Sequence, residues 1–314
     1  MPIIRLPLPM AGPVVTKTRN RTFCTALLAL AFATPSFAFD PVREDPPADA
    51  AHPARNQQVL VPSGGVGMNA LLQLAAGAGR KPTVVLLHGF PGNEQNLDLA
   101  QAIRRSGWNV LTLHYRGSWG SPGKFSIAGA IADASAAVAF VHRDDVAEQY
   151  GIDTSRIVVG GHSMGGFVAA RYVATHDDVV GLLLLDAWNI GADAQALRDG
   201  KYTQVDYEKN FDDLGNSLVG TNPEVVAREI RASGADWNLV RAAGRYAKLP
   251  VLTIWADRGI AKDNAALAAA IEGSDGHDLT ARHFPADHAF VDFRLAVADL
   301  VVRWLDAREG NAKN

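Results

Sequence analysis

Residues 158–166, which read VVGGHSMGG, constrain the fold of this chain more than any other stretch. They contain the pattern G-x-S-x-G, with Ser163 between Gly161 and Gly165. Glycines at these two positions let the backbone turn sharply from a strand into a helix, because they lack the Cβ atoms that would collide there. A chance match is the alternative in a chain with 29 glycines. The β-branched run before the pattern and the helical apolar spacing after it favour a strand, a turn that presents the Ser163 hydroxyl to solvent above the sheet, and a helix.

Apolar runs typical of buried strands alternate with helix-like stretches along most of the chain. This alternation predicts an α/β fold, a doubly wound and mainly parallel sheet with helices on both faces, over residues 57–314. The stretch at about 190–248 contains no strand-like run and has helical propensity near residues 223–232 and 237–246, so we expect it to be an inserted helical cap. The predicted strands are 58–62, 68–74, 83–87, 110–113, 156–159, 179–185, 251–255 and 279–284.

The first 38 residues have the pattern of a secretory signal peptide. Basic residues precede the apolar run 23–33, and Ser36 and Ala38 supply the small residues of a cleavage site. We expect cleavage after Ala38 and a periplasmic or secreted protein. The apolar run is shorter than the ~20 residues of a spanning helix, so no stable membrane insertion is expected after cleavage. Residues 39–56 are rich in proline, alanine and charge and predict a flexible lead-in.

Charge and composition exclude several classes of function. The net charge of −3 and the lack of a basic patch argue against a nucleic-acid partner. The one cysteine, Cys24, lies in the predicted signal peptide, so the mature chain has no thiol nucleophile. We find no metal-ligand spacing and no glycine-rich phosphate loop, and therefore expect no metal and no cofactor.

The chain resembles the α/β-hydrolase superfamily from about Gln57 to its C-terminus, apart from the expected cap. The resemblance rests on residues 151–157 leading into 161–166, and on Tyr115-Arg116-Gly117. These residues are similar to the branch that holds prolyl-oligopeptidase-like peptidases, acyl-peptide hydrolases and dienelactone-hydrolase-like esterases. The resemblance implies catalysis by a serine, a histidine and an acid that follow one another in the chain in the order Ser, acid, His.

His288 is the expected catalytic base, because it lies on a loop after the last predicted strand and follows Ser163 in the chain. A serine hydroxyl needs such a base to take its proton as it attacks a carbonyl. The backbone N–H of Met164, next to the nucleophile, is one expected oxyanion donor. The resemblance implies that the N–H of Phe90, in the His88–Gly92 turn, is the other.

The acid is the one element that departs from the superfamily pattern. The position of the usual aspartate falls on Gly259. Asp257, two residues earlier, is the preferred replacement if the turn is shaped differently, and Asp186, after the preceding strand, is the alternative. Asp263 is expected to be a helix N-cap. A site that lacks an acid also stays open at this point.

The sequence thus predicts an exported serine hydrolase that cleaves a carboxylic ester or amide through an acyl-enzyme on Ser163. Its partner would be a small-molecule ester, amide or peptide. One alternative is a secreted serine peptidase or aminopeptidase of the prolyl-oligopeptidase-like branch. The other is a binding protein that kept the fold without turnover, which the missing family aspartate favours.

Overall fold

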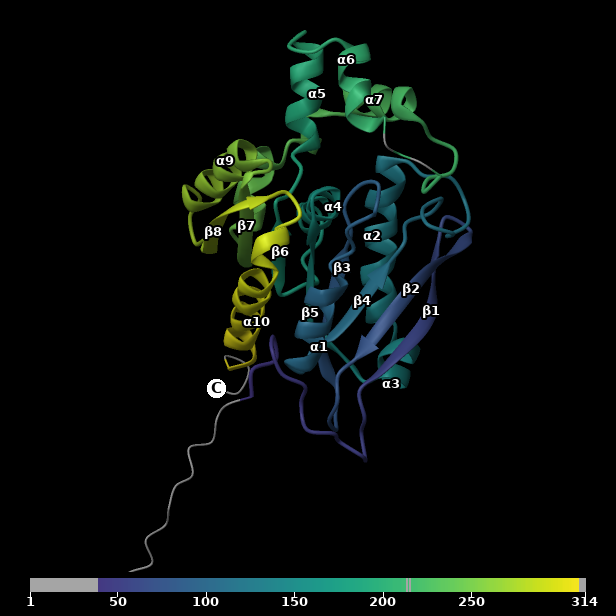
Figure 1. The fold of residues 1–314 in the computed structure, drawn as a ribbon, viewed down its shortest axis with the longest axis vertical. Coiled ribbons are helices and arrows are strands. Elements are labelled where there is room, and N and C mark those ends of the chain that lie inside the picture. The colour runs from purple at the N-terminus through teal and green to yellow at the C-terminus, as the bar shows by residue number, and fades with distance from the viewer. Residues whose placement is uncertain (1–38, 213, 215, 311–314) are drawn as a thin grey trace, which may run out of the picture. The chain divides into compact units, whose positions relative to one another are not determined.

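The computed structural model describes residues 39–212, 214 and 216–310, through which an eight-stranded sheet runs (Figure 1). The predicted signal peptide lies outside the described residues. The strands are β1 Arg55–Ser63, β2 Val66–Leu74, β3 Lys81–Leu87, β4 Asn109–Leu113, β5 Ile152–His162, β6 Gly181–Leu185, β7 Pro250–Arg258 and β8 Asp278–Asp287. Their order in the sheet is β1-β2-β4-β3-β5-β6-β7-β8. Strand β2 is antiparallel to both of its neighbours, and all other adjacent pairs are parallel.

Helices cover both faces of this sheet, which confirms the predicted doubly wound α/β fold. Helices α1 Leu97–Arg105 and α10 Arg294–Gly310 pack on one face. The other face carries α2 Ile127–His142, α3 Asp144–Tyr150, α4 Met164–Val173 and α9 Ala261–Glu272. The adjacent residues Val158 and Val159 of β5 are both fully buried, one in each core. Successive strand side chains point to opposite faces, so burial on both sides accounts for the continuous apolar runs in the sequence.

A helical segment joins β6 to β7 and occupies residues 190–248, here called the cap. It comprises α5 Ile190–Arg198, α6 Gln204–Glu208, η1 Lys209–Phe211, α7 Pro223–Ala232, η2 Ala235–Trp237, η3 Leu239–Ala242 and α8 Ala243–Tyr246. Its apolar residues share a core with α2 and α4. Backbone hydrogen bonds also join the cap to the loop after β4: Trp119 N–H donates to Ser217 O at 2.9 Å, and Val219 N–H donates to Gly117 O at 2.7 Å.

Two local features differ from the sequence expectation. The lead-in is packed against the fold, because Val42 is buried in the core beneath α1 and Arg105 Nε donates to the carbonyl of Pro41 at 2.6 Å. The strand predicted at 156–159 begins earlier, at Ile152, and its pairing with β3 is irregular between Ile152 and Ile157. None of the described helices is both long enough and apolar enough to cross a membrane.

Candidate active site

Ser163 occupies a strained turn between β5 and α4. Its backbone has φ 56° and ψ −119°, a left-handed φ that residues with a Cβ rarely adopt. Cβ atoms at Gly161 or Gly165 would overlap the carbonyl oxygen of Leu87, which explains both glycines of the pattern. The Ser163 N–H donates to Leu185 O at 2.9 Å and so ties the turn to the end of β6. Ser163 is only 7 % exposed, so the turn matches the prediction but its surroundings cover the residue more than expected.

His288 and Asp186 form a hydrogen-bonded pair beside this turn. His288 Nδ1 lies 2.6 Å from Asp186 Oδ2, although the two residues are 102 positions apart. The Asp186 carboxylate is fully buried at the end of β6, directly after Leu185. It also accepts hydrogen bonds from Ala256 N–H at 3.3 Å, Ile260 N–H at 3.1 Å and Asn264 Nδ2 at 3.2 Å. These donors compensate the desolvation of a buried carboxylate and hold it in one orientation.

Asp257 is not the partner of His288, so the preferred assignment of the acid is wrong and the alternative, Asp186, holds that place. Strand β7 continues through Arg258, which pairs with Asp287 of β8, and Asp257 therefore stays on the strand. Its Oδ1 lies 2.9 Å from Nδ1 of His283, and both side chains are largely exposed.

Asp263 is also placed differently from the expectation. It lies within the first turn of α9, and the N-cap residue of that helix is Ile260. Burial, and then repulsion from Asp193, raise the pKa of Asp263 above its usual value. The hydrogen bonds to the Asp186 carboxylate come from Ala256, Ile260, Asn264 and His288, and not from Asp263.

Two backbone amides beside Ser163 are suited to bind an oxyanion. Met164 is the first residue of α4, where helix N–H groups have no partner within the helix. Phe90 follows β3 in a loop that lies against the nucleophile, since a Cβ at Gly89 would stand 3.0 Å from Ser163 Cβ. Among the described residues, neither amide donates a hydrogen bond to another protein group. Both expected donors therefore remain free on the two sides of Ser163.

His162 has a structural role that the sequence did not reveal. Its Nε2 lies 2.7 Å from the backbone O of His288, and the two rings lie 4.5 Å apart. Burial, followed by repulsion from His288, lowers the pKa of His162 to about 4. The neutral ring therefore donates its Nε2–H to the His288 carbonyl and holds the loop that carries His288. No sequence pattern marked this contact or the Asn264 contact to Asp186, because both join distant parts of the chain.

Aromatic side chains of the cap lie over the Phe90 loop. The Phe90 ring is 5.7 Å from that of Phe211 and 6.5 Å from that of Trp188. Asp193 of the cap accepts hydrogen bonds from Trp188 Nε1 and Tyr207 Oη, both at 2.7 Å. The surroundings of the oxyanion loop are thus apolar and include residues from both the cap and the sheet.

The described residues include no group of three or more histidine, cysteine or acidic side chains placed to hold a metal ion. The groups that the fold brings together beside Ser163 are a hydroxyl, an imidazole, a carboxylate and two backbone amides.

Curated relatives share part of the sequence. An α/β-hydrolase domain-containing protein of Arabidopsis thaliana, WAV2, is 38 % identical over 109 residues, which is 34 % of each chain. An uncharacterized protein of Mycobacterium tuberculosis is 31 % identical over 125 residues, 40 % of this chain and 43 % of the relative. The matches thus span less than half the length of these curated relatives.

Solved structures share the fold at low sequence identity. A hyperthermophilic esterase of the archaeon Pyrobaculum calidifontis superimposes with a TM-score of 0.56 at 20 % identity, over 82 % of this chain and 88 % of its own. A bacterial brefeldin A esterase does so with a TM-score of 0.62 at 17 % identity, over 86 % of this chain and 82 % of its own. The family model described as "alpha/beta hydrolase fold" matches residues 82–290, which hold the sheet strands from β3 to β8. The chain belongs to the α/β-hydrolase fold family.

Proposed function

We propose that this protein is an exported serine hydrolase that cleaves a carboxylic ester through an acyl-enzyme on Ser163. The observation that carries the proposal is the 2.6 Å hydrogen bond between His288 Nδ1 and Asp186 Oδ2, beside a serine on a strained turn. A serine, a histidine and a buried carboxylate that is hydrogen-bonded to the histidine are the groups that activate a hydroxyl. The esterases among the structural neighbours support ester cleavage as the reaction.

The residues then have the following roles. Ser163 Oγ attacks the ester carbonyl while His288 takes its proton, and Asp186 holds the imidazole in the required tautomer. The N–H groups of Phe90 and Met164 stabilise the oxyanion of the tetrahedral intermediate. His288 next gives its proton to the leaving alcohol. A water molecule, deprotonated by His288, releases the carboxylic acid and restores Ser163.

The apolar surroundings of Phe90 favour an ester with an apolar acyl group of small or medium size. The rings of Phe211 and Trp188 lie next to Phe90, and Trp188 directly follows Ala187 and Asp186 in the chain. An acyl chain bound on Ser163 in this position would be desolvated by these rings, which adds about 25 cal/mol for each Å² of apolar surface removed from water. A charged acyl group would lose its hydration without gaining a partner.

A fluorophosphonate probe tests the nucleophile. The purified protein is expected to be labelled on Ser163, and Ser163→Ala is expected to lose labelling and ester hydrolysis while its melting temperature stays within a few degrees. Ser155→Ala removes an exposed hydroxyl from the same strand and is the matched control. Unlabelled wild-type protein would favour a binding protein without turnover and contradict the proposal.

Substrate profiling separates ester from peptide cleavage. p-Nitrophenyl esters of increasing acyl length are compared with aminoacyl and prolyl p-nitroanilides at equal enzyme concentration. We expect the esters to be hydrolysed with the higher kcat/KM. Faster cleavage of the amides would assign the protein to the secreted peptidases instead. Mass spectrometry of protein from the cell envelope and medium tests export, with a mature N-terminus at Phe39 as the expected result.

A further inference from the structure

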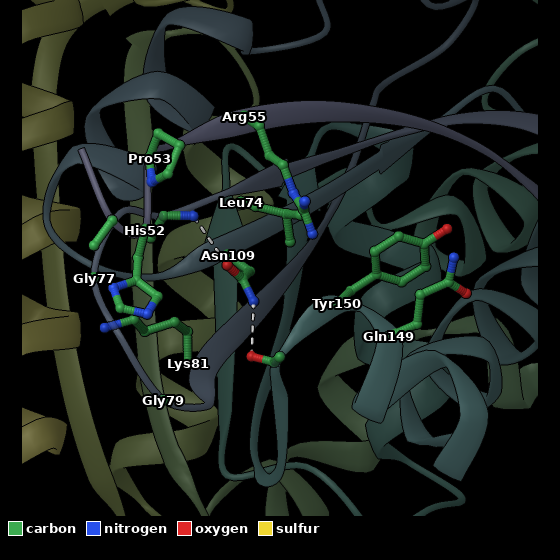
Figure 2. Close-up of a pocket in the computed structure, with 13 residues that line it drawn as sticks. His52, Pro53, Arg55, Leu74, Gly77, Gly79, Lys81, Asn109, Gln149 and Tyr150 are labelled. Carbon is green, nitrogen blue, oxygen red and sulfur yellow. Dashed lines mark hydrogen bonds between the residues drawn. The ribbon is translucent and has the colours of Figure 1, made fainter. Parts of the chain in front are cut away.

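A cavity lies at the end of the sheet opposite the candidate active site, and Figure 2 shows residues that line it. Its volume is about 260 Å³, and residues at the start of β1, β3 and β4 contribute to its wall. Gly151, just before β5, lines it, whereas Ser163 follows the other end of that 11-residue strand. Strand β3 pairs with β5 from Lys81 beside Ile152 to Leu87 beside Gly161, so the rise per residue of β3 puts roughly 20 Å between the cavity and the turn that carries Ser163. The cavity is thus separate from the proposed hydrolase site.

Positive charge collects in this cavity without a carboxylate in its wall. Arg55, Lys81 and His52 line it, and no aspartate or glutamate does. Among the described residues, neither the Arg55 guanidinium nor the Lys81 ammonium forms a salt bridge or a side-chain hydrogen bond. Asp49 lies outside the wall, with its Oδ1 4.0 Å from Nδ1 of His52. Two permanent cations therefore border an open cavity whose wall has no carboxylate. Beside the cavity, hydrogen bonds from the His52 and Ala51 amides and, more weakly, the charge of Lys81 lower the pKa of Asp49.

The rest of the wall combines a rigid amide with apolar and hydroxyl groups. Asn109 is buried, and both ends of its amide are engaged: Oδ1 accepts from Ala75 N–H at 3.0 Å and Nδ2 donates to Gly151 O at 3.4 Å. In Figure 2, Arg55 lies on one side of Asn109, and Lys81 lies with His52 on the other. Tyr150 and Leu74 complete the wall beside Arg55. The fixed Asn109 side chain thus separates two cationic walls.

We propose that this cavity binds a small phosphate monoester. A guanidinium fork and an ammonium together match a phosphate group, whose charge is about −1.5 to −2 near pH 7. The volume is at or below the lower end of the ~300–1,000 Å³ range of small-molecule pockets, which favours a ligand smaller than a nucleotide. Arg55 donates to the phosphoryl oxygens, Lys81 attracts the anion from the other side of Asn109, and Tyr150 and Leu74, which lie beside Arg55, contact the organic part. This proposal does not depend on the hydrolase activity.

Isothermal titration calorimetry with inorganic phosphate and with glycerol 3-phosphate tests the site. We expect one saturable site that binds the ester more tightly than inorganic phosphate, with a Kd that rises as salt is added. Arg55→Gln and Lys81→Gln are each expected to weaken binding about tenfold or more, the loss of one charge-assisted hydrogen bond. Acetate, which has a carboxylate and one charge, is expected to compete weakly. Equal competition by acetate would overturn the assignment to phosphate.

Matched variants separate this site from unspecific attraction and from the active site. Lys201→Gln and Arg241→Gln remove exposed cations of the cap, and His288→Ala alters the candidate active site; all three are expected to keep the wild-type Kd. Lys81→Arg keeps the charge and is expected to bind within about threefold of wild type, which guards against a folding defect in Lys81→Gln. No saturable binding by wild type, or an unchanged Kd when Arg55 and Lys81 are both replaced by Gln, would overturn the proposal.

Discussion

Gly259 lies so close to Asp186 that a Cβ atom at residue 259 would overlap the Oδ2 of that carboxylate. The amide of the next residue, Ile260, donates to the same oxygen at 3.1 Å. The loop after β7, where the superfamily resemblance placed an acid, therefore surrounds a carboxylate that comes from the end of β6. The carboxylate next to His288 therefore comes from residue 186 and not from residue 259.

Asparagine substitutions distinguish the two aspartates that the sequence left open. Asp186→Asn should lower kcat in the ester assay by roughly 10⁴, because an amide no longer fixes the required tautomer of His288. Asp257→Asn should change kcat by less than about threefold, since Asp257 contacts His283 on the surface. Initial rates with a p-nitrophenyl ester measure both effects, and circular dichroism checks the fold. A larger loss in Asp257→Asn than in Asp186→Asn would contradict this assignment.

The lack of space at residue 259 predicts that even a methyl group there lowers the activity. Gly259→Ala should displace the Asp186 carboxylate and lower kcat at least tenfold, with a smaller effect on KM, because the substrate does not contact the acid. Gly244→Ala is the matched control, since a Cβ there meets no atom within 4 Å. Wild-type kcat in Gly259→Ala would show that the carboxylate can move without loss of function.

Moving the carboxylate from residue 186 to residue 259 tests whether kcat depends on its position next to His288 and not on its position in the chain. With Asp186→Gly the carboxylate is removed and the space beside residue 259 opens. Adding Gly259→Asp in that background should raise kcat at least tenfold over Asp186→Gly alone, because Gly259 does not have a positive φ and its backbone accepts a side chain. Unchanged rates in the double variant would mean that the loop cannot direct a carboxylate towards His288.

The sheet was predictable from the sequence because its pattern is local. Each buried strand is a continuous apolar run, as Val158 and Val159 illustrate, and both glycines of the G-x-S-x-G pattern serve the same sharp turn. The acid was not predictable in the same way. The choice between Asp257 and Asp186 depends on how far β7 continues before it turns, and pairing between Arg258 and Asp287 decides that. The reason for a glycine at residue 259 also lies outside the local sequence, because it is the close approach to Asp186.

Contacts between distant segments could not be predicted either, because the sequence arguments rest on local patterns. His162 meets the carbonyl of His288 across 126 positions, and no local pattern encodes such a contact. The cationic cavity likewise gathers Arg55, Lys81 and Tyr150 from separate elements. Each of these residues reads as an ordinary exposed or half-buried side chain when the sequence is taken alone.

Trp119 connects the cap to the loop that carries the Phe90 amide. Its Nε1 donates to Pro91 O at 2.9 Å, and its own N–H donates to Ser217 O of the cap at 2.9 Å. Trp119→Phe keeps a ring but removes the donor to Pro91, so we expect kcat to fall about tenfold through a less well-placed oxyanion donor, with KM changed less. Trp255→Phe, which alters a ring stacked on His283, is the control. A loss confined to KM would instead indicate that Trp119 contacts the substrate.

Two buried histidines predict how stability depends on pH. Burial lowers the pKa of His88 to about 4, and repulsion from His114 lowers it further. The hydrogen bond to the Gly89 carbonyl opposes both effects. Burial and then His288 lower the pKa of His162 to about 4, with Arg294 adding to the effect and Asp186 opposing it. Both rings are therefore neutral in the folded protein at pH values where an unfolded histidine, with a pKa of about 6.5, becomes protonated.

The unfolded chain thus binds more protons than the folded chain between about pH 6.5 and pH 4, and the free energy of unfolding must fall as the pH is lowered through this range. The contribution of each histidine is fully present above about pH 6.5 and amounts to roughly 3 kcal/mol at most. Guanidinium unfolding at pH values from 8 to 4.5 measures the slope. His162→Gln should reduce the pH dependence of the free energy of unfolding by the equivalent of up to one proton. His277→Gln, which removes an exposed histidine, should leave this pH dependence unchanged. Equal slopes in wild type and His162→Gln would show that the folded protein does not lower the pKa of His162, and would contradict the effect assigned to burial and His288.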